Sequence, residues 1–126
     1  MKPHVCVDAR LMSATGIGTF LKSSLLNLSQ AAHCDLTLLC HEQDLEKASK
    51  LASRTIPMKS GIYTVKEQLE LKKQIPCCDL FWAPHFNVPL MPIRAKKRLT
   101  TICDVYHLAH FSSLTLFQKI YAKTQI

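Results

Sequence analysis

Short apolar runs alternate with segments of helical periodicity along nearly the whole chain, and this alternation limits the folds available to it more than any other feature. Apolar residues recur at helical spacing from Ile17 to Leu28, from Glu42 to Ala52 and from Tyr63 to Gln74. Strand-like runs lie between these helices, at 5–9, 35–41, 54–58, 79–83 and 98–104. Such alternation predicts a doubly wound α/β domain with a mostly parallel sheet. The last pattern is helical, with Leu114, Phe117 and Tyr121 on one side, so we expect the domain to be incomplete at its C-terminal end.

Length and composition are those of one globular domain covering residues 1–126, with 20% charged and 48% apolar residues. The run before Asp8 is too short for a signal peptide, which predicts a cytoplasmic protein. The most apolar window, 75–93, contains Asp79, His85 and four prolines, and therefore does not suit a lipid bilayer.

Six cysteines without a C-x-x-C pair are typical of reduced thiols. Cys34, Cys40 and His41 lack the tight pairing of zinc ligands, so we expect no metal site.

A net charge of +7 favours anionic partners such as phosphates or an acidic membrane face. The basic runs at 72–73 and 96–98 contain no aromatic residue, which argues against nucleic acid. Unpaired sheet edges would also allow self-association. Edge pairing and a peripheral contact with the inner membrane surface are therefore further expectations.

The loop Ser13–Gly18 contains two of the three glycines in the chain, Gly16 and Gly18. This spacing indicates either positive φ or close approach by a ligand. The helix that follows would point free N–H groups at an anion, but a simple helix cap without a ligand explains the pattern equally well. Leu21 stands where a dinucleotide fingerprint has its third glycine, so NAD is not expected.

The runs at 79–83 and 98–104 predict neighbouring buried strands, which deliver polar groups to one sheet edge. His85, Asn87, Asp104 and His107 follow them, as ligand-binding residues do at the carboxyl ends of parallel strands. Other interpretations stay open: Asp104 caps a turn, and Asp8 pairs with Arg10 or caps its strand.

The remaining expectations concern burial. Trp82 is expected in the core rather than on a sugar-stacking surface. The helix at 63–74 is expected to bury Ile62, Val65 and Leu69, and to direct Glu67, Glu70, Lys72 and Lys73 to water.

Four motifs taken together resemble the N-terminal domain of family 4 glycosyltransferases, of the GT-B type, over nearly the whole chain. They are Val7-Asp-Ala-Arg10, Thr15-Gly-Ile-Gly18, Ala83-Pro-His-Phe-Asn-Val-Pro89 and Thr101-Ile-Cys-Asp-Val-Tyr-His-Leu108. The resemblance implies a Rossmann-like half of a GT-B fold. It also implies retaining, metal-independent transfer of a sugar from a nucleotide-sugar donor to a glycan or lipid-linked acceptor, with no further cofactor.

The resemblance also implies the site residues. Asp104 and His107 are the catalytic candidates, and the substrate-binding candidates are Gly16, Ile17, Gly18, His85, Asn87, Asp8 and Arg10. Cys103 stands where the family commonly has histidine. Because a thiol is a poor donor, this exchange would cost about 10²- to 10³-fold in rate.

The family's C-terminal donor domain is missing from these residues, so we expect the chain by itself to transfer no sugar. Two alternatives are a non-catalytic α/β remnant that binds anions or a partner protein, and a two-chain enzyme with its donor domain on another polypeptide.

Overall fold

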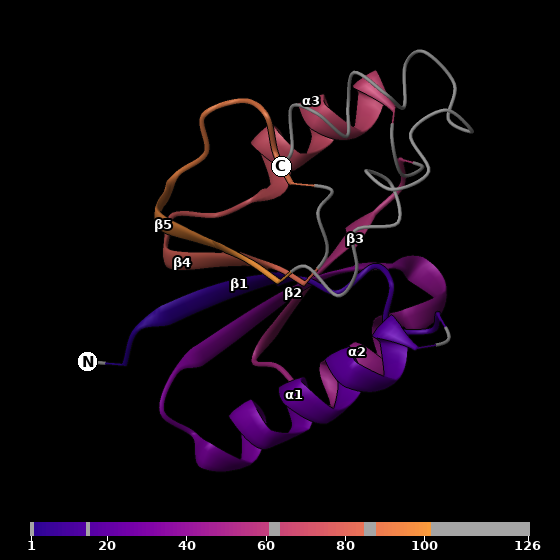
Figure 1. Cartoon of the computed structure of the whole chain (residues 1–126), viewed down its shortest axis with the longest axis vertical. Coiled ribbons are helices and arrows are strands. Elements are labelled where there is room, and N and C mark those ends of the chain that lie inside the picture. Colours follow the sequence, from indigo (N-terminus) through magenta and orange to yellow (C-terminus); the bar gives the residue numbers. More distant parts are fainter. Residues whose placement is uncertain (1, 15, 61–63, 85–87, 102–126) are drawn as a thin grey trace.

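The computed structural model describes residues 2–14, 16–60, 64–84 and 88–101. Within these residues the chain forms a five-stranded parallel sheet in the order β3-β2-β1-β4-β5, with helices on both faces (Figure 1). The strands are β1 (His4–Asp8), β2 (Asp35–His41), β3 (Arg54–Met58), β4 (Cys78–Ala83) and β5 (Ala95–Thr100). The helices are α1 (Ile17–Ala31), α2 (Leu45–Ser49) after a 3₁₀ turn at Glu42–Asp44, and α3 (Val65–Gln74). The predicted doubly wound, Rossmann-like α/β fold with a parallel sheet is confirmed.

The strand order reverses between β1 and β4. From β1 the chain moves outward through β2 to β3, then returns through α3 to β4 on the other side of β1. Val5 pairs in register with Leu80, and Val7 with Trp82. Open α/β sheets usually bind their ligands outside the carboxyl ends of the strands at such a reversal.

Each face of the sheet has its own core. Val7 and Leu38 pack with Leu21 and Leu25 of α1 on one face, and Ala48 of α2 joins them there. On the other face, the α3 side, the core consists of Cys6, Leu39, Ile56, Met58, Leu71, Ile75, Cys78 and Phe81. This alternation between faces is what parallel strands covered on both sides require. Trp82 is buried, as the sequence predicts.

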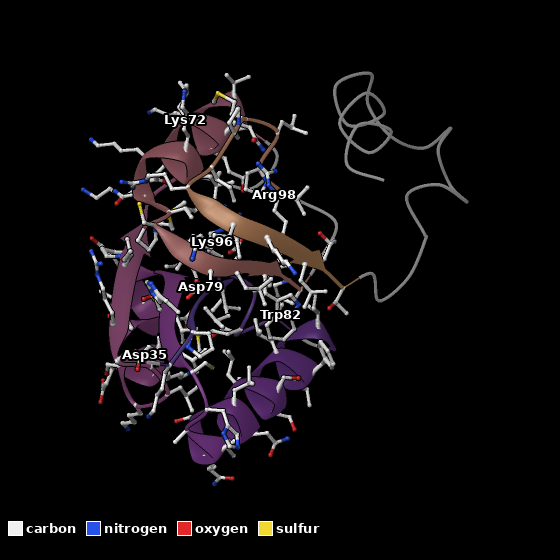
Figure 2. The ribbon with its side chains drawn as sticks, turned by 90° about the vertical axis from the view of Figure 1, so that its left-hand side faces the viewer. Asp35, Lys72, Asp79, Trp82, Lys96 and Arg98 are labelled. Atoms are coloured by element: carbon white, nitrogen blue, oxygen red, sulfur yellow. The ribbon has the colours of Figure 1, made fainter. Side chains whose placement is uncertain are left out.

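The expectation for the last strand is wrong in two respects. β5 begins at Ala95 rather than Arg98 and ends at Thr100, and its side chains are largely exposed. Within the described residues it is an edge strand, paired with β4 on one side. Lysines on an edge strand oppose pairing with another chain, and Lys96 instead approaches Asp79 at 3.2 Å (Figure 2). β3 forms the other edge of the described sheet and carries Pro57, a residue that edge strands tolerate.

The buried side of α3 also differs from the prediction. Val65 and Leu69 are 66% and 58% exposed, whereas Glu67 and Gln68 are buried. The helix begins at Val65, where Thr64 caps it by accepting the N–H of Glu67 at 3.0 Å. Polar contacts of Glu67 and Gln68, described below, set the rotation of the helix. Ile62 and Tyr63 lie outside the described residues.

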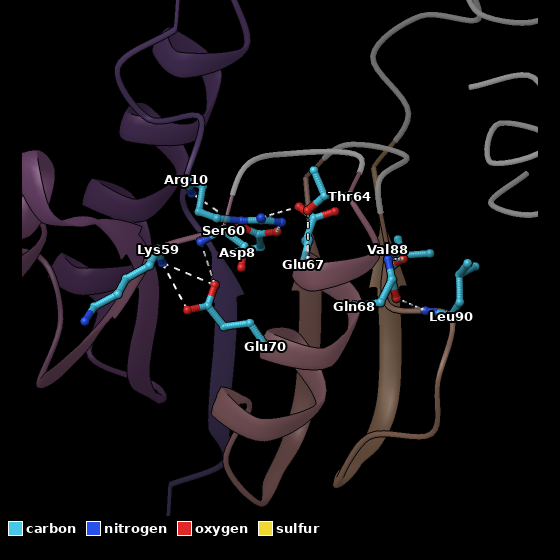
Figure 3. Close-up of polar contacts among 10 residues, drawn as sticks. All are labelled: Asp8, Arg10, Lys59, Ser60, Thr64, Glu67, Gln68, Glu70, Val88 and Leu90. Atoms are coloured by element: carbon cyan, nitrogen blue, oxygen red, sulfur yellow. Dashed lines mark hydrogen bonds and ion pairs between the residues drawn. The ribbon is translucent and has the colours of Figure 1, made fainter. Parts of the chain in front are cut away.

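Glu70 of α3 is partly buried and hydrogen-bonded rather than freely solvated. It accepts the backbone N–H groups of Lys59, at 3.1 Å, and of Ser60, at 2.9 Å (Figure 3). Burial acts to raise the pKa of Glu70, but these backbone donors outweigh it and the net pKa is lowered. A carboxylate with a lowered pKa stabilises the fold above its unfolded pKa, and this contribution is lost as the pH falls through the folded pKa.

Replacing Glu70 with glutamine should therefore lower the free energy of unfolding at neutral pH by about 1 kcal/mol, since the site is partly solvated. The difference from the wild type should shrink below the ordinary pKa of 4.5. Urea titrations at a series of pH values would measure it. Glu46→Gln, on exposed α2, is the control; a pH-independent difference for Glu70→Gln would contradict the assignment.

No helix in the described part of the chain is long and apolar enough to cross a bilayer.

Candidate functional site

The carboxyl ends of β1, β4 and β5 lie at one edge of the sheet, together with the first turns of α1 and α3. We call this edge the carboxyl rim and define it by residues 8–14, 16–19, 64–68, 83–84 and 100–101. Asp8, Arg10, Gly16, Ile17 and Gly18 of the predicted site lie on it. β4 ends at Ala83 and β5 at Thr100, so both strands end at this rim before the other candidates occur in the sequence. Those other candidates, His85, Asn87, Asp104 and His107, are outside the described residues.

A buried ionic cluster lies at the end of β1 (Figure 3). Arg10 donates from Nε to Asp8 Oδ1 at 2.8 Å and from one terminal nitrogen to Asp8 Oδ2 at 2.6 Å. Its other terminal nitrogen pairs with Glu67 of α3. All three side chains are at most 1% exposed. The guanidinium therefore joins the end of β1 to the first turn of α3 through charge-assisted bonds in a dry environment.

The two neighbouring carboxylates, Asp8 and Glu67, determine the direction in which the pKa of Arg10 is shifted. Burial alone would lower the pKa of Arg10, but the adjacent Asp8 and then Glu67 outweigh burial and raise it. Arg10 therefore stays cationic between two carboxylates. The interpretation in which Asp8 and Arg10 pair with each other is confirmed, and their binding of substrate stays a prediction. Buried side chains of this kind act by holding the rim backbone in place.

Glu67 is the functional residue that sequence reasoning missed. The sequence predicts a place on the solvated side of the helix, because charged residues are seldom fully buried without a partner. Two signals were available: Thr64 and Glu67 have capping-box spacing at a helix start, and Glu67 lies four residues before the buried Leu71. What the sequence did not supply was the partner, because Arg10 is 57 residues away.

Gln68 extends the same turn of α3 toward the loop after β4. Its side-chain oxygen accepts the N–H of Leu90 at 2.7 Å, and its Nε2 lies 3.4 Å from the carbonyl oxygen of Val88 (Figure 3). Glu67 thus contacts the segment after β1, and Gln68 contacts the segment at Val88 and Leu90. The first turn of α3 is a common support for both.

The glycine turn opens α1 on the other side of the rim. Gly16 has φ +71°, which confirms the predicted positive φ, and open space surrounds the position of an added Cβ. At Gly18 a Cβ would come within 2.8 Å of the carbonyl oxygen of Met12, so the close approach there is by the chain's own backbone.

The start of α1 has the features of an anion site without a ligand to prove one. Among the described residues no side chain caps the helix, and its first turn contains no acidic residue. Free N–H groups at such a helix start favour an anion. Ser13, in the preceding loop, donates to buried Asp44 at 2.6 Å and anchors the loop to the turn before α2. The choice between an anion site and a plain helix start therefore stays open.

Other chemistry receives no support from the described residues. No group of three or more histidine, cysteine, aspartate or glutamate side chains is arranged to hold a metal ion in that part of the chain. Burial raises the pKa of the Cys6 and Cys40 thiols, which favours the unreactive protonated form. At the rim, the backbone N–H groups at the start of α1 are the donors that suit an anion, whereas the charges of the buried cluster are taken up by its own members.

Fold and rim together define a doubly wound α/β domain with a candidate ligand site at its topological switch point. Searches of protein-family models, of curated proteins and of solved structures found no match to this chain.

Proposed function

We propose that this chain is the acceptor-side portion of a retaining, metal-independent glycosyltransferase, which moves a sugar from a nucleotide-sugar donor to a glycan or lipid-linked acceptor. The observation that supports it most is the meeting, at one carboxyl rim, of the glycine turn that opens α1 with the ends of β1, β4 and β5. These are the positions at which the four motifs of the glycosyltransferase resemblance occur or begin. Any parallel sheet brings its strand ends to one edge, so the rim gives these motifs a common location, and the motif sequences themselves support the assignment.

The chemistry of the rim suits the two parts of a nucleotide sugar. The exposed first turn of α1 offers N–H groups and the positive end of the helix dipole to a diphosphate. The sequence after Ala83 and after Thr101 contains histidine, asparagine and aspartate, residue types that can hydrogen-bond to sugar hydroxyl groups. In this proposal Asp104 and His107 face the reacting sugar, and Gly16, Ile17 and Gly18 approach the donor phosphates or the acceptor.

The buried cluster has an indirect role in the proposal. Asp8, Arg10 and Glu67 fix the end of β1 against α3, and Gln68 holds the loop at Val88 and Leu90. Fixed loops keep binding groups in place, which matters because small misplacements reduce rates steeply. We propose action at the cytoplasmic face of a membrane, where exposed basic residues such as Lys72 and Lys97 would favour acidic lipids.

The alternative function is a non-catalytic module that binds anions through the same helix start. The net charge of +7 favours it. The two proposals differ in selectivity, since a plain anion module would bind inorganic pyrophosphate as well as it binds a nucleotide sugar. A sugar-transfer domain would favour the nucleotide sugar, because the loops beyond the phosphates add contacts.

Replacing Thr19 with glutamate tests the donor end of the rim. Thr19 is exposed in the first turn of α1, where a carboxylate stabilises a helix but repels a bound diphosphate. We expect Thr19→Glu to weaken the binding of UDP-glucose or GDP-mannose about tenfold, equivalent to about 1.4 kcal/mol. NMR titrations that follow the amide signals of residues 16–20 would measure it.

Thr19→Gln is the neutral control of the same shape and should bind as the wild type does. An equal loss of nucleotide-sugar affinity in Thr19→Glu and Thr19→Gln would indicate a steric effect rather than an effect of charge. Signals that move only at the amino edge of the sheet, near Pro3 or Asp35, would refute the rim as the binding site. Equal affinity for pyrophosphate and nucleotide sugar would favour the anion module.

A further inference from the structure

An apolar groove lies between α1 and β5, away from the polar residues of the carboxyl rim. It measures roughly 350 Å³, and its lining is apolar except for one serine. Figure 2 shows Trp82 between the sheet and α1 on this side of the molecule. We call it the α1–β5 groove and define it by Val5, Ser24, Leu28, Leu80, Trp82 and Leu99.

The groove leaves large apolar side chains in water. Leu99 is 48% exposed, and Phe20, which meets the Trp82 ring edge-on at 6.4 Å, is 42% exposed. On the opposite face of the sheet, Phe81 of β4 packs in one core with Leu71 of α3. There Arg98 donates to the carbonyl groups of Pro89 and Met91, and Ile93 packs against the core beneath α3. Contiguous apolar surface of this kind usually marks a place where something docks.

The chain leaves the sheet next to this groove. Thr101 donates its N–H to the carbonyl oxygen of Ala83 at 3.1 Å. Its hydroxyl accepts the indole N–H of Trp82 at 2.9 Å. Because Trp82 lines the groove, this bond fixes the start of the following segment on the groove side of the sheet.

Residues 102–126 lie outside the described residues, and their sequence alone indicates what they can cover. Leu114, Phe117 and Tyr121 recur at helical spacing, and Thr115 and Lys119 fall on the opposite side of the same pattern. A helix of about 10 residues spans about 15 Å, comparable to one strand of the sheet. The residues between Thr101 and Phe111 suffice for the turn back along the sheet.

We propose that the segment 111–123 docks in the α1–β5 groove as an amphipathic helix, with Leu114, Phe117 and Tyr121 against Leu28, Trp82 and Leu99. A second copy of the chain is the weaker occupant, because it would bring two basic β5 edges together. The inference concerns packing and does not depend on the proposed sugar transfer.

Hydrogen exchange on the full chain, resolved by mass spectrometry, tests the docking. In the wild type the amides of 111–123 should be protected, and Leu99→Lys should reduce that protection at least about tenfold. The matched control is Leu26→Lys: Leu26 is 47% exposed on α1 but does not line the groove. On the docking segment itself, Phe117→Lys should reduce the protection of 111–123 as Leu99→Lys does. Thr115→Lys should leave that protection at the wild-type level.

Three results would overturn the proposal: no protection of 111–123 in the wild type, equal protection in Leu99→Lys and Leu26→Lys, or protection that disappears on dilution as the mass by light scattering falls from dimer to monomer. The last would show that a second copy covers the groove. Circular dichroism of each variant checks that the fold is retained, and Phe117→Lys leaves the described sheet and helices unchanged.

Discussion

Replacing Arg10 with methionine should lower the free energy of unfolding by about 3–5 kcal/mol, the usual effect of removing one partner from a buried ion pair. Arg10 is the cation shared by Asp8 and Glu67, and all three side chains are shielded from water. Methionine occupies a similar volume, so the loss would come mainly from two buried carboxylates deprived of their common cation. Arg10→Lys should recover only part of the stability, because one ammonium group cannot reproduce the bidentate contact with Asp8.

Urea denaturation followed by the fluorescence of Trp82, the one tryptophan in the chain, measures this loss. Arg54→Met, at an exposed position of edge strand β3, is the control and should change stability by less than about 0.5 kcal/mol. Equal stability of the Arg10→Met variant and the wild type would mean that the cluster contributes no net stability. In that case its role would be limited to ordering the rim.

Replacing Gly18 with alanine should also destabilise the fold, by about 1–3 kcal/mol, although alanine is the better helix former. The new Cβ would lie 2.8 Å from the carbonyl oxygen of Met12 and 3.1 Å from that of Leu11. Both are backbone atoms of the loop after β1, so neither can turn away as a flexible side chain would. The whole loop would have to shift against α1.

Thermal or urea unfolding of Gly18→Ala beside Ser23→Ala separates the two effects. Ser23 is exposed on the same helix, so its replacement reports helix propensity alone and should be neutral or slightly stabilising. If Gly18→Ala also proved stabilising, the close contact with Met12 would have to be looser than the structure shows. A change in the amide signals of residues 11–14 should accompany the destabilisation.

The fold could be predicted from the sequence because its signals are local. A buried parallel strand such as Asp35–His41 is a continuous apolar run, and a covering helix such as α1 shows its period in Leu21, Leu25 and Leu28. Prediction failed where a distant residue decides the outcome. β5 begins earlier than its apolar pattern because β4 pairs with the lysines before it, and α3 is rotated because Arg10 pairs with Glu67.

Within the candidate site, too, features set by the local sequence could be predicted, and contacts between distant residues could not. The positive φ of Gly16 follows from a local turn, and the gathering of strand ends at one rim follows from a parallel sheet, so both could be predicted. The cluster of Asp8 and Arg10 with Glu67 needed the three-dimensional arrangement. His85, Asn87, Asp104 and His107 remain predictions from the sequence.

The bond between His4 and Asp79 has a practical consequence for binding measurements. The backbone N–H of His4 donates to Asp79 at 2.7 Å and fixes the start of β1 at the amino edge, across the sheet from the glycine turn. A biotin or affinity tag attached ahead of Lys2 would therefore anchor the protein to a sensor chip with its opposite end turned toward the flowing solution. Immobilisation through the N-terminus leaves that end accessible to nucleotides and glycans.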